Sequence, residues 1–230
     1  MLSGFSELDN LTGGFRKGEL TVIAGQPGMG KTTLCWSIGA KLAQSGYNVI
    51  MFYSNEGIID CSVSHKDIFN SGDNLMDIQT PLRLGNMIEL IERRKKHSEV
   101  DIVFIPHLSF RTQGETEVAL SSLRGFTDLY NFSAVIELPV KRTVDNSADR
   151  RPRINHIRYP KTVNMIADNI LFVYRDDYYC SNDAQFKDFE IIVAKCDAGK
   201  KGTARLKIVA EIKRVDVMIP MILSNEGDCD

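Results

Sequence analysis

The sequence lacks the features of a membrane-spanning protein, a secreted protein or a protein with a structural zinc site. No apolar run approaches the roughly 20 residues that a transmembrane helix needs, and the N-terminus has no charged segment followed by an apolar one, as a signal peptide would. The five cysteines are scattered, odd in number and without a C-x-x-C pair, and the four histidines show no ligand spacing. We therefore expect a cytoplasmic protein with reduced thiols and no membrane partner.

The chain also has no large excess of charge of either sign. Its formal net charge is −2 over 230 residues, with 25% charged and 43% hydrophobic residues, as in ordinary soluble globular proteins. A nucleic-acid partner would therefore need a local basic patch. The length suits one sizeable α/β domain, and no Pro/Gly/Ser-rich linker divides it, so we expect residues 1–230 to form a single domain.

Short apolar runs alternate with helical patterns along the chain. Strands are predicted over 20–24, 49–53, 102–105, 134–138 and 170–174, and helices over 31–45, 84–96 and 115–131. A late hairpin is predicted from apolar runs that flank Gly199 and Gly202. This order predicts an α/β fold with a mainly parallel central sheet, helices on both faces and a C-terminal antiparallel hairpin. Residues 57–82 are polar and irregular, and no element is predicted there.

A complete G-x-x-x-x-G-K-[ST] motif lies between the first strand and the first long helix. Glycines let backbone N–H groups curl around phosphate oxygens, while Lys31 would reach the β- and γ-phosphates and the Thr32 hydroxyl would hold Mg²⁺. The alternative is a glycine-rich turn without a ligand, which the flanking strand and helix argue against. The residues expected to contact ATP are Gly25, Gln26, Pro27, Gly28, Met29, Gly30, Lys31, Thr32 and Thr33.

The segment before this P-loop extends the pattern beyond a single motif. Residues 4–15 read GFSELDNLTGGF, Gly18-Glu19-Leu20 follows, and the loop itself has the form G-x-P-G-M-G-K-T. Together they resemble RecA-like ATPase cores, and most of all the C-terminal motor domain of replicative DnaB-type helicases. The KaiC/RadA-like branch shares the entry segment and the P-loop, but the run RDDYY at 175–179 favours the helicase branch.

The resemblance implies a RecA-like P-loop NTPase that hydrolyses ATP in a hexameric ring around single-stranded DNA. It also implies that Lys31 and Glu56 act in catalysis. In the family a Glu at the end of the second strand orients the attacking water, and Ser54-Asn55-Glu56 occupies that place here. The alternative for Glu56 is an ordinary acidic residue at a strand end.

Three family positions that matter for catalysis are not matched. Pro106 stands where the Walker B aspartate ends the third strand, and residues 138–141 read LPVK instead of a Ser-Gln-Leu sensor. Asp197 stands where an arginine would reach the neighbouring subunit's γ-phosphate, and a carboxylate there would repel phosphate. We therefore expect weak ATP hydrolysis or none. A non-enzymatic regulator built on a helicase relic, and a KaiC/RadA-like ATPase, stay open as alternatives.

Two further expectations concern partners. Since the chain starts almost directly at the motor core, we expect no N-terminal helicase domain or linker helix, and a hexamer is expected less strongly than in the family. The family places a DNA-binding loop after the fourth strand, where residues 141–153 carry a local basic excess. The alternative is a solvated loop that binds nothing. The residues that would contact single-stranded DNA are Lys141, Arg142, Arg150, Arg151 and Arg153.

Overall fold

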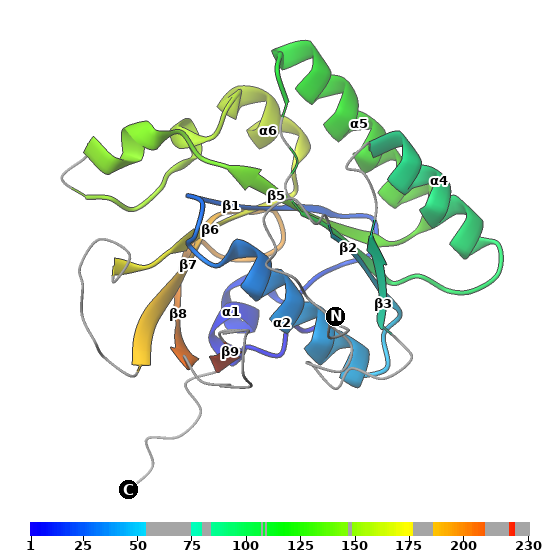
Figure 1. Cartoon of the computed structure of the whole chain (residues 1–230), viewed down its shortest axis with the longest axis horizontal. Helices are drawn as coiled ribbons and strands as arrows, with labels where there is room; N and C mark the ends of the chain where they lie inside the picture. The colour runs from blue at the N-terminus through cyan, green and yellow to red at the C-terminus, as the bar shows by residue number, and fades with distance from the viewer. Residues whose placement is uncertain are drawn as a thin grey trace, which may run out of the picture.

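Nine strands form one twisted sheet in the part of the chain that the computed structural model describes (Figure 1). The described residues are 1–53, 75–79, 84–106, 108, 110–146, 149–176, 186–209 and 221–223. Glu56, the catalytic candidate from the sequence, lies outside them.

The strand order is β3-β2-β4-β5-β1-β6-β7-β8-β9. The strands are β1 (Leu20–Gly25), β2 (Val49–Tyr53), β3 (Leu75–Gln79), β4 (Ile102–Ile105), β5 (Ser133–Pro139), β6 (Asn169–Tyr174), β7 (Phe186–Cys196), β8 (Gly202–Val209) and β9 (Met221–Leu223). From β3 to β6 all neighbouring pairs are parallel, and from β6 to β9 all are antiparallel. The predicted parallel sheet with a C-terminal antiparallel hairpin is therefore confirmed.

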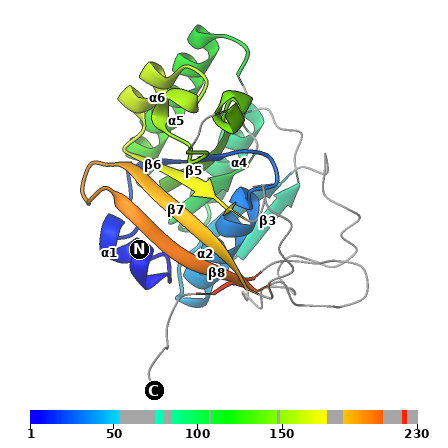
Figure 2. The same ribbon diagram turned by 90° about the vertical axis from the view of Figure 1, so that its left-hand side faces the viewer.

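Helices cover both faces of this sheet, as the sequence predicted (Figures 1 and 2). The helices are α1 (Ser6–Thr12), α2 (Lys31–Gln44), α4 (Leu84–Lys95), α5 (Gln113–Tyr130) and α6 (Pro160–Ile166), with 3-10 turns η1 (Arg142–Asn146) and η2 (Ile154–His156). One core layer joins α1 and α2 to the sheet, and a second joins α4, α5 and α6 to its other face. The central strands β1 and β4 are buried along their whole length, which explains their uninterrupted apolar sequence.

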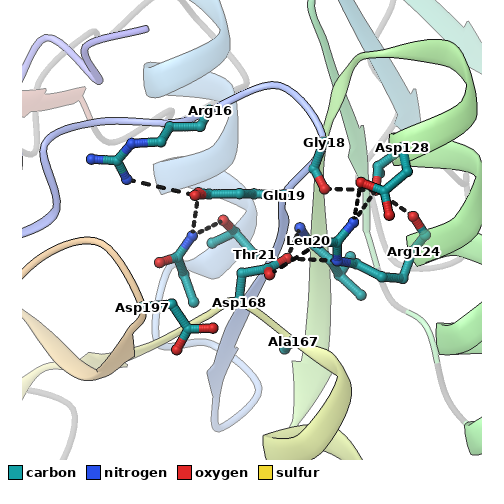
Figure 3. A network of polar contacts seen from close by, with 12 residues as sticks. Arg16, Gly18, Glu19, Leu20, Thr21, Arg124, Asp128, Ala167, Asp168 and Asp197 are labelled. Atoms are coloured by element: carbon teal, nitrogen blue, oxygen red, sulfur yellow. Dashed lines mark hydrogen bonds and ion pairs between the residues drawn. The ribbon is translucent and has the colours of Figure 1, made fainter.

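A network of polar contacts lies at the end of the sheet where the parallel strands begin (Figure 3). The carboxylate of Asp168, just before β6, accepts the backbone N–H of Leu20 at 2.7 Å and pairs with Arg124 Nε of α5 at 2.9 Å. Next to it, the Asn169 amide donates to the Glu19 carboxylate at 3.0 Å. These contacts fix the first residues of β1 and β6 against α5, at the edge opposite the P-loop.

Several short elements were not predicted from the sequence. The strands β3 and β9 have five and three residues, and α1 and α6 have seven each. Helix α6 begins with Pro160, a residue that fits the first helical position because its missing N–H has no intrahelical partner there. Length alone is not the reason, because β2 and β4 have only five and four residues and were predicted from their uninterrupted apolar sequence. The strand β3, with the sequence LMDIQ, has no such apolar run.

Candidate nucleotide-binding site

The P-loop joins the carboxyl end of β1 to the amino end of α2. Two of its glycines have left-handed backbone, with φ of +79° at Gly28 and +91° at Gly30. At Gly30 a Cβ atom would also lie 3.0 Å from the Phe189 ring of β7. Side chains are disfavoured at both positions, so the loop takes this path because glycine is present.

A cavity of about 510 Å³ opens over this loop. It is lined by Pro27, Gly28, Gly30, Lys31, Thr32, Thr33, Leu108, Glu137, Leu138, Pro139 and Arg175. The cavity brings together six of the nine predicted contact residues. The other three do not line it: Gly25 ends β1, and Gln26 and Met29 are buried in the loop.

Lys31 is held inside the loop that it belongs to. It is buried, and its Nζ donates to the backbone carbonyl of Gln26 at 3.0 Å. Burial lowers the pKa of this amine, and the nearby Glu137 carboxylate opposes that shift. Burial also raises the pKa of the neighbouring Cys35 thiol well above its usual range, so this cysteine is a packing residue in the neutral form.

Glu137 is the acid that the sequence analysis missed. It lies on β5 with 1% of its surface exposed, and its Oε2 accepts the Thr32 hydroxyl at 2.9 Å. A signal was available, because Glu137 is the only ionisable residue in the strand SAVIELP. The family resemblance gives no role to this position, so the motif alone did not point to it.

Apolar residues occupy the unmatched Walker B position and the start of the sensor position. Pro106 follows β4 and is buried. Leu138 and Pro139, at the sensor position, line the cavity without a side-chain donor or acceptor. Only backbone polar groups are therefore available at these three positions.

The segment at the arginine-finger position lies far from the P-loop of its own chain. Cys196 pairs with Asn169, the first residue of β6, at the amino edge of the sheet. The adjacent Lys195 ammonium donates to the Ala167 carbonyl at 2.6 Å and lies 3.4 Å from the Asp197 carboxylate. Asp197 could therefore meet a triphosphate only on another subunit.

Arg175 is a second cavity residue whose place was not predicted. In the sequence it appeared only as part of a run that supported the family resemblance. The structure puts it just after β6, half-buried and on the cavity wall. It adds a second cationic side chain to the cavity beside Lys31, which suits an anionic ligand.

The five basic residues after β5 have different surroundings. Arg151 makes a two-pronged ion pair with the buried Glu190 at 2.7 and 2.9 Å, and Arg153 pairs with Asp149 at 3.3 Å. All five residues are exposed, including Arg151 and Arg153 with 44% and 71% of their side chains. Because the guanidinium of Arg151 is already held by a buried carboxylate, this residue is less available than Lys141 and Arg142 to contact a polyanion.

The family model described as DnaB-like helicase C terminal domain matches residues 1–71 and 63–216. The chain belongs to this family. The KaiC/RadA-like and non-enzymatic alternatives are not favoured by these matches, and ATPase domains of the family use nucleotide with Mg²⁺.

Individual replicative helicases are similar to this chain along most of its length. The chain is 28% identical to a probable replicative DNA helicase of Trieres chinensis and 25% identical to the replicative DNA helicase DnaB of Geobacillus stearothermophilus. These matches cover 90% and 92% of this chain, but only 55% of each relative. The chain thus spans about half the length of the curated relatives that it matches.

Two solved structures share the fold. One, described as an ATPase domain, superposes with a TM-score of 0.80 and 21% identity, covering 97% of this chain and 90% of the other. A DnaB-like replicative helicase, described together with its interactions with primase, gives 0.74 and 21%, covering 91% and 61%. These similarities establish a DnaB-like ATPase fold.

The donor atoms in the cavity suit a magnesium–nucleotide complex. Thr32 and Glu137 supply hydroxyl and carboxylate oxygens, the hard ligands that Mg²⁺ prefers. The described residues contain no cluster of three or more His, Cys, Asp or Glu side chains that could hold a metal alone. Protein sites usually bind Mg²⁺ through one or two side chains plus substrate phosphates and water. Among the described helices, none is long and apolar enough to cross a membrane.

Proposed function

We propose that this chain binds ATP·Mg²⁺ through Gly25–Thr33 as the motor domain of a DnaB-type replicative DNA helicase in the cytoplasm. One observation carries the proposal: a cavity over the P-loop is lined by Lys31, Thr32 and the Glu137 carboxylate that accepts the Thr32 hydroxyl. Lys31 would bind the β- and γ-phosphates, the loop N–H groups would surround them, and Thr32 would ligate the metal. Glu56 is the residue proposed to orient the attacking water.

We further propose that ATP turnover by the chain is weak. Leu138 and Pro139 offer no side chain that could sense the γ-phosphate. Asp197 replaces an arginine whose contribution in trans is worth roughly 10³ to 10⁵ in rate. Binding energy from the P-loop acts on substrate and transition state alike, so these losses reduce turnover more than affinity.

Replacing Lys31 tests the binding proposal. We expect Lys31→Ala to weaken ATP·Mg²⁺ binding by about 10- to 100-fold, since charge-assisted hydrogen bonds to the phosphates are lost. Isothermal titration calorimetry would measure the dissociation constants. Lys161→Ala, at an exposed position on α6, is the matched control and should bind like the wild type. Equal affinity in all three proteins, or no binding by the wild type, would overturn the proposal.

The proposed partners are single-stranded DNA and further copies of the chain in a hexameric ring. The position of Asp197, where the family has an arginine finger, supports self-association. Asp197 lies where the parallel strands begin, at the end of the sheet opposite the P-loop of its own chain. The loop after β5 supports DNA contact through the exposed cations Lys141, Arg142 and Arg150. Arg151 and Arg153, which pair with carboxylates, would contribute less.

The DNA proposal predicts different behaviour for two arginines. We expect Arg142→Ala to weaken binding of a fluorescent oligothymidylate and to reduce the slope of log K against log salt by about 0.7, the value for one phosphate contact. Arg151→Ala should mainly lower the melting temperature, because Glu190 would stay buried without its bidentate partner. Fluorescence anisotropy at several salt concentrations checks the first effect, and thermal unfolding the second. An unchanged salt slope in Arg142→Ala would remove this residue from the DNA contact.

A further inference from the structure

We propose that Glu137 has taken over the magnesium-supporting role of the missing Walker B acid, from the neighbouring strand. The inference rests on the proposed binding of ATP·Mg²⁺ and deepens it. In P-loop NTPases the metal is held by the P-loop Ser/Thr together with an acid at the end of a core strand. Here that strand, β4, ends in Pro106, which has no carboxylate.

The register of the sheet places Glu137 beside the missing acid. Strand β5 lies between β4 and β1, and Ile105 of β4 pairs with Ile136 of β5. The next residues along, Pro106 and Glu137, are therefore level with each other. Because β5 is adjacent to β1, an acid on β5 lies one strand closer to the P-loop, roughly 4.8 Å.

Side-chain alternation places Glu137 on the α2 face of the sheet. Val135, two residues earlier, packs in the core layer that contains α2, whereas Ile136 packs in the opposite layer. Phe104 of β4 also packs in the α2 layer, so the position of Pro106, two residues further on, has the same facing. Glu137 on β5 therefore lies at the same level of the sheet, and on the same face, as an acid at position 106 of β4 would.

The contact that Glu137 makes is the one that this role requires. Its Oε2 accepts the hydroxyl of Thr32, the proposed metal ligand, at 2.9 Å, and Glu137 lines the cavity with Lys31. A carboxylate bonded to the ligand hydroxyl orients the lone pairs of that oxygen, and its negative charge favours a cation beside it. Glu137 is therefore a positioning residue for the metal, acting through Thr32.

Stability alone does not account for an acid here. Six of the seven β5 residues are buried, and Glu137 is 1% exposed. The Thr32 hydroxyl and the nearby Lys31 ammonium compensate the burial of this carboxylate, whereas an apolar residue at the same place would need no polar partner. The acid therefore depends on polar partners in the P-loop, which is the place that metal support requires.

The test measures metal binding separately from turnover. Nucleotide affinity is determined with Mg²⁺ and with EDTA, and Mn²⁺ binding to the protein–ADP complex is followed by electron paramagnetic resonance. The variants are Glu137→Gln, of the same shape, and Glu137→Leu, whose side chain suits an apolar strand. Glu117→Gln, an exposed position on α5, is the control for the change in charge.

We expect Glu137→Gln and Glu137→Leu to lose roughly 10- to 100-fold in Mn²⁺ affinity, the usual effect of removing an outer-shell partner. With EDTA both should bind nucleotide at least as well as the wild type, because a negative charge near the phosphates is gone. Wild-type Mn²⁺ affinity in a folded Glu137→Leu protein would overturn the inference. No nucleotide binding by the wild type would instead refute the proposed function, so the two failures are distinguishable.

Discussion

We expect Asp197→Arg to raise ATP turnover by about 10- to 1,000-fold under conditions in which the chain self-associates. An arginine finger is worth roughly 10³ to 10⁵, and the apolar residues at the sensor position should limit the recovery. The reason is electrostatic: a carboxylate repels the γ-phosphate, whereas a guanidinium stabilises the charge that develops on it. Asp197 is half-exposed beside Lys195, so the substitution disturbs no packed core.

Concentration dependence identifies the mechanism of this gain. Since residue 197 lies at the sheet edge opposite the P-loop of its own chain, the arginine can act only on a neighbouring subunit. Single-turnover rates should therefore rise with protein concentration in Asp197→Arg. Glu117→Arg, on the exposed surface of α5, makes the same change in charge and should leave the rate unchanged. A gain that is independent of concentration, or no gain in a sample shown to be assembled, would contradict a finger role for this position.

The second large effect is expected at Gly30. We predict that Gly30→Ala weakens ATP binding by more than about 100-fold, the loss of two phosphate hydrogen bonds of roughly 1.5 kcal/mol each. The backbone there has φ of +91°, and the new Cβ would lie 3.0 Å from the Phe189 ring. The Phe189 ring would have to shift by a few tenths of an ångström, and an alanine held at this φ costs about 1–3 kcal/mol of stability. Calorimetric titration gives the affinity, and urea unfolding gives the stability.

Gly125→Ala is the matched control for this substitution. Gly125 lies within α5, and a Cβ there would meet no atom within 4 Å. Because alanine restricts the unfolded chain and favours helix, we expect a gain of about 0.5–1 kcal/mol with no change in nucleotide affinity. If both glycine variants bind ATP like the wild type, the cavity over the P-loop is not the nucleotide site.

Much of the fold could be predicted because its signals are local. The apolar runs that became β1, β2, β4, β5 and β6 are the buried centre of a parallel sheet, where nearly every side chain must be apolar. Helix α5 was recognisable from its periodic apolar residues. The short strand β3 was not, because five residues at a sheet edge resemble a polar loop in sequence.

The candidate site also has one part that the sequence predicts and another part that it does not. The P-loop is contiguous in the chain, so its path over the cavity followed from one motif. The approach of Glu137 to Thr32 joins residues 105 positions apart and depends on the order β4-β5-β1 in the sheet. The ion pair of Arg151 with Glu190, which changes how the basic loop is interpreted, joins two segments 39 residues apart. Sequence spacing carries no information on either contact.

The central claim is that the chain binds ATP·Mg²⁺ at its P-loop but turns it over slowly. The most direct test measures the ATP dissociation constant and the single-turnover rate on one wild-type sample at ring-forming concentration. We predict saturable, Mg²⁺-dependent binding with a rate about 10³-fold or more below the roughly 10 s⁻¹ of a typical enzyme. Binding accompanied by turnover near 10 s⁻¹ would contradict the account, as would a sample that binds no ATP.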